Sequence, residues 1–129
     1  HLGLKIAFDE RIAHTIYAGS DLFLIPSRYE PCGLTQMYSL RYGTVPVVRA
    51  TGGLDDSIRE FDPVTGIGNG FKFEAASPDA LVGAVRNALA AFGRPYDWQA
   101  LVRNAFDGDF SWEKAAGEYM DLYSKLAEL

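Results

Sequence analysis

The chain has 129 residues, enough for one domain with a real core but few for a complete two-domain enzyme. Its apolar fraction of 48% and charged fraction of 22% are typical of a soluble globular protein, and no apolar run approaches membrane-spanning length. The net charge of −5 argues against nucleic-acid binding, which usually requires a basic face.

Cysteine usage and the first residues set the expected context. Cys32 is the only cysteine, which excludes an intramolecular disulfide and a multi-cysteine metal site, and a cytoplasmic location is the simplest expectation. The sequence opens at His1 with no methionine and no signal-peptide pattern, directly before a strand-like run. We therefore expect this start to be a cut within a longer protein.

Strand and helix patterns alternate along the chain. Apolar runs predict strands at residues 4–8, 21–26, 45–48 and 70–73, with Pro46 among the first residues of its strand or at a bulge. Periodic apolar positions predict helices at 10–19, 33–42, 54–60 and 78–92, then around 98–106 and 112–126. The order predicts one α/β domain over residues 1–129, a Rossmann-like parallel sheet with helices on both faces and a helical C-terminus.

In the long helix at 78–92, the periodicity predicts that Val82, Val85, Leu89 and Phe92 form the apolar face. The last three helices carry more apolar surface than four short strands can cover. Part of that surface is expected to dock on a partner domain.

The turn between the second strand and the second helix is the strongest candidate for a ligand site. Ligands of open α/β sheets bind beyond the carboxyl ends of the strands. The first helical turn would present unpaired backbone N–H groups near Gly33, Leu34 and Thr35, which suit a phosphate. Glu30 lies just before that turn, where its carboxylate could accept hydrogen bonds from ligand hydroxyls.

Three segments carry a family resemblance. The stretch from Pro26 to Gln36 reads PSRYEPCGLTQ, residues 42–49 read YGTVPVVR and residues 51–56 read TGGLDD. Together they resemble the bacterial glycogen synthases and plant starch synthases, which are retaining glycosyltransferases of family 5 with the GT-B fold. The likeness is long and nearly ungapped, and it covers nearly the whole chain.

The resemblance implies a function. These enzymes have two Rossmann-like halves with the active site in the cleft between them, and this chain corresponds to the last two-thirds of the C-terminal half. That half holds the nucleotide sugar, usually ADP-glucose, without a metal or other cofactor. Glucose passes to the non-reducing 4-OH of an α-1,4-glucan with retained configuration, and ADP is the other product. The missing N-terminal GT-B domain is then the expected partner.

The resemblance also assigns site residues by position. Glu30 is expected to contact the donor glucose and help position the reacting centre, so it is the candidate catalytic residue. The candidate substrate-binding residues are Phe8 against the adenine, Cys32 beside the sugar, Gly33, Leu34 and Thr35 on the distal phosphate, and Gly52 and Gly53 along the cleft.

Two departures from the wider family matter. A second glutamate often follows the first by eight residues, but here that position is Tyr38, which fits the bacterial and plant synthases and disfavours the animal type. The arginine and lysine that neutralise the diphosphate would come from sequence before His1. We therefore expect the 129 residues alone to bind nucleotide weakly and to transfer no glucose, because stabilisation of the leaving group must grow in the transition state.

Simpler interpretations compete with each assignment. Glu30 could be a solvated carboxylate, Cys32 a small buried residue and Phe8 a core residue, while Gly52 and Gly53 could only permit a tight turn. His14 and the aromatic last helix are more typical of packing than of ligand binding. Asp55 and Asp56 are adjacent on a helix and point apart, so no metal site is predicted. For the whole chain, the alternatives are a nucleotide- or glucan-binding module without turnover, or an inert piece that self-associates.

Overall fold

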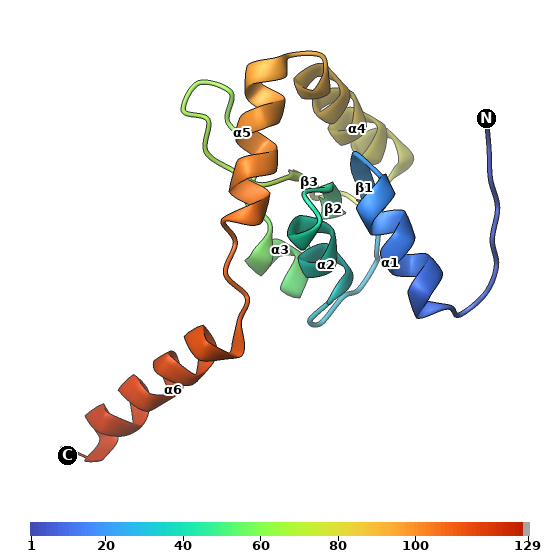
Figure 1. Cartoon of the computed structure of the whole chain (residues 1–129). Helices are drawn as coiled ribbons and strands as arrows, with labels where there is room; N and C mark the ends of the chain where they lie inside the picture. The colour runs from blue at the N-terminus through green and yellow to red at the C-terminus, as the bar shows by residue number, and fades with distance from the viewer. Residues whose placement is uncertain (128–129) are drawn as a thin grey trace.

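The computed structural model describes residues 1–127, and its centre is a parallel sheet of three strands in the order β1-β2-β3 (Figure 1). The strands are β1 (Leu22–Ile25), β2 (Val45–Arg49) and β3 (Phe71–Phe73). Leu24 pairs with Val47, and Val48 pairs with Lys72. Pro46 is the second residue of the central strand, within the early positions that the sequence predicts.

In the described part of the chain, six helices accompany the sheet: α1 (Glu10–Gly19), α2 (Thr35–Arg41), α3 (Gly53–Ser57), α4 (Pro78–Phe92), α5 (Pro95–Phe106) and α6 (Trp112–Ala127). Side-chain caps begin three of them, and each cap accepts an otherwise unpaired N–H of the first turn. Asp9 accepts from Ile12, Ser77 from Ala80 and Ser111 from Lys114.

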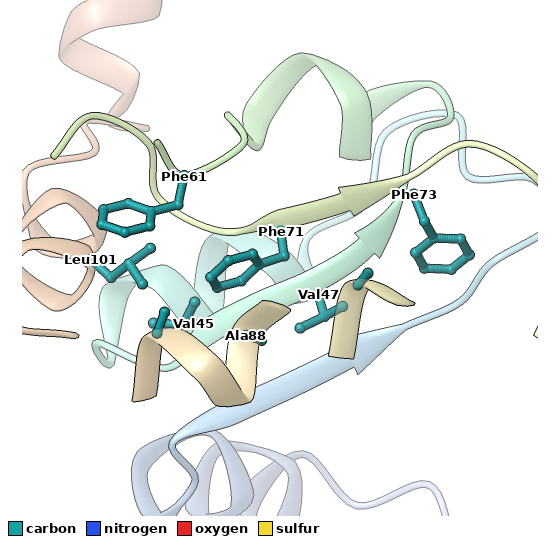
Figure 2. Packing of buried hydrophobic residues seen from close by; sticks show 9 residues of the cluster. Val45, Val47, Phe61, Phe71, Phe73, Ala88 and Leu101 are labelled. Atoms are coloured by element: carbon teal, nitrogen blue, oxygen red, sulfur yellow. The ribbon is translucent and has the colours of Figure 1, made fainter. Parts of the chain in front are cut away.

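The core lies on both faces of the sheet. On one face, Val45 and Val47 of β2 and the phenylalanines of β3 pack against α4 and Leu101 of α5, as Figure 2 shows. On the other face, Val48 packs with Leu40 of α2 and Leu54 of α3. The predicted arrangement, helices on both faces of a Rossmann-like parallel sheet, is therefore confirmed, with three strands in place of four within residues 1–127.

The strand predicted at residues 4–8 is wrong. This segment has no regular structure, and Leu4, Ile6 and Phe8 are all strongly exposed. The alternating pattern shows which residues could share a face, but a strand also needs a hydrogen-bonded neighbour and a surface to cover. The structure provides neither for this segment, which extends away from α1 in Figure 1.

The predicted apolar face of α4 is wrong for Val82, Leu89 and Phe92, although Val85 packs against the core. The buried residues are Ala84, Ala88 and Ala91, whereas Leu89 and Phe92 are about half exposed. Both the alanines and the larger apolar residues recur at helical spacing on α4. A prediction that selects the larger side chains therefore selects the wrong face. The alanines face the sheet because their small side chains let the helix backbone approach Phe71 and Phe73 closely.

The last helix stands apart from the rest of the structure. No residue of α6 is buried, and Figure 1 shows the helix projecting away from the sheet. Its exposed large apolar residues are Trp112, Tyr119, Met120, Leu122, Tyr123 and Leu126. Among residues 1–127, no helix combines the length and the apolar character needed to cross a membrane.

Thr44 connects the end of α1 to the start of β2. Its buried hydroxyl lies within hydrogen-bond distance of the carbonyl oxygens of Tyr17 and of Ser20, the latter at 2.9 Å. The same residue accepts a hydrogen bond from Ser39 of α2 through its own carbonyl. Three elements therefore meet at one buried polar residue, and this junction sets where β2 begins.

Replacing the Thr44 hydroxyl with a methyl group should destabilise the fold. Thr44→Val keeps the shape but leaves buried carbonyl groups without their donor, which costs about 1–3 kcal/mol of unfolding free energy. Urea denaturation measures the loss. Thr15→Val is the matched control, because that hydroxyl is exposed on α1 and bonds only to the carbonyl of Arg11. Equal stability of the two variants would contradict this role of Thr44.

Candidate functional site

The loop after β1 and the turn after β2 form one unit at the carboxyl edge of the sheet. The amide of Gly53 lies 3.1 Å from the carbonyl oxygen of Glu30 and 3.3 Å from that of Pro31. A Cβ on Gly52 would lie 2.2 Å from the oxygen of Glu30, and one on Gly53 would lie 1.7 Å from the oxygen of Cys32. Only glycine allows the two backbones to pack this closely.

Glu30 and Cys32 lie on the outer side of this unit. The Glu30 side chain is half-buried, and Ser27 donates a long hydrogen bond of 3.4 Å to its carboxylate. Most of the hydrogen-bonding capacity of this carboxylate is therefore available to a ligand. Cys32 is an exposed free thiol, so the interpretation as a buried packing residue does not apply to it.

The start of α2 follows directly. Gly33 has a positive φ of 71°, and the space on its Cβ side is filled by the amide of Gln36. Leu34 precedes the first helical residue, makes no side-chain cap and is 58% exposed. Thr35 opens the helix and is half-buried. The first N–H groups of the helix lack partners within it, as in any helix.

Phe8 is the one predicted site residue that does not lie in the loop after β1 or the turn after β2. Its ring is 96% exposed, in the irregular segment before α1. The other seven residues of the predicted site come from the two connections that follow β1 and β2. The structure shows no contact between Phe8 and these residues, so its stacking on a base stays a prediction.

Arg49 is a residue of this edge whose role the sequence did not reveal. Its guanidinium donates to the carbonyl oxygens of Arg28 at 2.6 Å, of Ser27 at 3.5 Å and of Glu74 at 3.0 Å. Arg49 thus ties the connection after β1 to the residue that follows β3. The available signal was its place at the end of a strand, next to the loop.

Gln36 is the second residue that sequence reasoning missed. It is fully buried in the first turn of α2. Its side-chain nitrogen donates to the carbonyl oxygen of Cys32 in the loop after β1 and to that of Gly53 in the turn that begins α3. The signal was present, because a glutamine three residues after Gly33 and facing the apolar core side of a helix needs buried partners.

Two other candidates have structural partners. Asp55 forms an ion pair with Lys72, with 2.6 Å between carboxylate oxygen and ammonium nitrogen. His14 packs against three tyrosine rings and lies 3.3 Å from the hydroxyl of Tyr42. One of those rings is Tyr17, whose pKa is raised by burial and by Tyr38 nearby. Within residues 1–127, no group of three His, Cys, Asp or Glu side chains is arranged to hold a metal ion.

Comparison with known proteins identifies the family. The family described as glycosyl transferases group 1 matches residues 7–99, which include every strand and all of the loop and turn described above. The chain belongs to this family. Its family region therefore includes all eight residues of the predicted site.

Several relatives within the group 1 glycosyl transferases share one name. The chain is 55% identical over 126 residues to a glycogen synthase of Koribacter versatilis and 52% identical over 122 residues to one of Fervidobacterium nodosum. Those matches cover 98% and 95% of this chain. They cover 26% and 25% of the relatives, so the chain spans about a quarter of the length of these curated proteins.

Solved structures give the same assignment. The catalytic domain of starch synthase IV from Arabidopsis thaliana, bound to ADP and acarbose, superposes with a TM-score of 0.82 at 43% identity. It matches 93% of this chain and 25% of its own. A sucrose-phosphate synthase from Thermosynechococcus elongatus, at 25% identity, has a TM-score of 0.67 and shares the fold. Part of a GT-B C-terminal domain, the fold that the resemblance implies, is thus confirmed.

The tight packing of the Gly52–Gly53 turn gives a second prediction. Gly53→Ala should lower the unfolding free energy by about 1–3 kcal/mol, because the new methyl group collides with backbone rather than with a movable side chain. Gly83→Ala on α4 is the control, since nothing lies within 4 Å of its Cβ position and alanine favours the helix by about 1 kcal/mol. Urea denaturation of both variants decides; a Gly53→Ala protein as stable as the parent would refute this packing.

Proposed function

We propose that the protein is a glycogen synthase and that this chain forms the donor side of its active site. The parent enzyme would transfer glucose from ADP-glucose to the non-reducing end of an α-1,4-glucan and release ADP. The carrying observation is the fused loop and turn at the carboxyl edge of the sheet, which keep the Glu30 carboxylate and the start of α2 together. About half of this sequence is identical in proteins named glycogen synthase.

Each residue of the site then has a task. The Glu30 carboxylate would accept hydrogen bonds from hydroxyls of the donor glucose, and Cys32 would lie beside that sugar. The backbone N–H groups of Gly33 and Leu34, together with the Thr35 hydroxyl, would bind the distal phosphate. The exposed ring of Phe8 would stack on the adenine, and Gly52 and Gly53 would line the cleft.

No metal cofactor is part of the proposal. Group transfer places growing negative charge on the leaving diphosphate, and hydrogen-bond donors that meet this charge lower the barrier. The backbone donors at the start of α2 would meet part of it. Cationic side chains of the parent protein outside these 129 residues would supply the rest, so the isolated chain should not catalyse transfer.

The proposed partner of this chain is the remainder of the parent protein, including an N-terminal GT-B domain. Support comes from the share of the relatives that the chain covers and from the exposed apolar surface of α6. A separate apolar area involves α2, where Leu34, Met37, Tyr38 and Phe110 help line a cavity of about 400 Å³. Self-association through these surfaces is the competing outcome.

Transfer of radiolabelled glucose from ADP-glucose to glycogen by the full-length protein tests this function. Glu30→Ala should reduce kcat at least a hundredfold, because the donor sugar loses its positioning contact. Glu74→Ala is the control, since that exposed carboxylate follows β3 at the same edge. Wild-type protein that binds ADP but never elongates glycogen would replace this function with a binding module.

ADP titration by calorimetry tests the phosphate site separately. Thr35→Val removes one hydroxyl donor to a charged group and should weaken ADP binding about ten- to a hundredfold, while Glu30→Ala should leave it nearly unchanged. Thr15→Val serves as the control. Undiminished ADP affinity in Thr35→Val would remove the start of α2 from the proposed phosphate site.

A further inference from the structure

We propose that Gln36 is a positioning residue of the donor site, which rests on the function proposed above. Its side chain joins the loop that carries Glu30 and Cys32 to the turn that begins α3. Among the residues of the predicted site, Gly52 and Gly53 join these two segments through their backbone. Gln36 joins them through a side chain that is fully buried, so it would act through the backbone of its neighbours.

The contacts of one amide nitrogen carry the proposal. Gln36 Nε2 lies 3.2 Å from the carbonyl oxygens of Cys32 and Gly33, 3.4 Å from that of Gly53 and 3.2 Å from the hydroxyl of Ser57. Two hydrogens serve these four acceptors, so the bonds are shared. The opposite amide orientation would set Oε1 against three carbonyl oxygens, which fixes the direction of the amide.

The amide oxygen of Gln36 indicates that this side chain does more than fill space in the core. Gln36 Oε1 is buried and has no hydrogen-bond partner in the described part of the chain. A side chain that served the core alone would avoid an unpaired buried acceptor, since an apolar residue of the same shape carries no such penalty. What glutamine adds is the set of bonds to the loop and the turn.

The position of the amide explains the role of its neighbour as well. Gln36 Oε1 would lie 2.5 Å from a Cβ on Gly33, so the glycine makes room for the amide behind the loop. The loop is therefore fixed from two directions. Gly52 and Gly53 pack against residues 30–32 from one element, and Gln36 bonds to residues 32 and 33 from another. These two sets of contacts would keep the hydrogen-bond donors of residues 33–35 at a fixed position relative to the carboxylate of Glu30.

Two variants in the full-length protein test this role. Gln36→Met keeps the volume and removes the donors, and kcat/KM for ADP-glucose should fall at least tenfold, with the KM for glycogen unchanged. Ser57→Ala removes one of the four acceptors and should show a smaller loss, which keeps the test available if Gln36→Met does not fold.

The matched control is Ser39→Ala. Ser39 is equally buried on the same helix, and its hydroxyl donates to the carbonyl of Thr44 at 2.9 Å, away from the loop. This variant should lower Tm while leaving the kinetic constants unchanged. If Gln36→Met likewise lowers Tm without changing kcat/KM, Gln36 is merely structural and the proposal is overturned.

Hydrogen exchange separates this proposal from the proposed function. Gln36→Met should accelerate exchange in residues 27–35 and 50–57 together, whereas Ser39→Ala should affect residues around 44. Unchanged exchange in either of the first two segments overturns the positioning role. If the wild-type protein transfers no glucose, the proposed function fails, and the exchange data still decide whether Gln36 couples the loop to the turn.

Discussion

The contact between the Gly52–Gly53 backbone and the carbonyl groups of Glu30 and Cys32 is the constraint on which the carboxyl edge of this structure depends. Parallel strands deliver their carboxyl ends to one edge of the sheet, but that alone leaves each connection free to follow its own path. Here two connections touch through their main chains, where no side chain can adjust. Positions 52 and 53 are glycine because a Cβ at either position would collide with the backbone of residues 30–32.

The structure uses different interactions at different places. Apolar burial on both faces of the sheet fixes the strands and the helices that cover them, and small residues on α4 set how closely that helix approaches. Polar side chains fix the connections. Arg49, Gln36 and Thr44 each bond to backbone carbonyl groups of segments distant in sequence. Hydrogen bonds to main-chain atoms define a loop path more strictly than burial, because they depend on direction as well as distance.

Sequence patterns predicted the periodic and local features of this fold well. Within residues 1–127, the three strands and six helices that the patterns predicted depend on nearby residues, which a single sequence displays. The two wrong predictions concern features that depend on residues distant in the sequence. Residues 4–8 alternate like a strand but have no neighbouring strand, and the buried side of α4 was decided by phenylalanines of β3.

In the candidate site, too, the sequence predicted the features that depend on nearby residues and missed those that depend on distant ones. Seven of its eight predicted residues lie in the two connections that the structure brings together, because both follow strands of one parallel sheet. The role of Phe8 was assigned from the family resemblance, and the strand predicted to end at this residue does not form. Arg49 and Gln36 were missed as supports, since nothing local to either residue states which carbonyl groups will face it.

The isolation of α6 has a thermodynamic consequence. A helix of this length gains little from its own backbone hydrogen bonds, and most helices in proteins are stabilised by packing of an apolar face. Docking of Trp112, Tyr119, Tyr123 and Leu126 onto another surface would therefore add to the order of the helix itself. Burial of those rings would give the association a negative heat-capacity change, so its enthalpy would become steadily more favourable as the temperature rises.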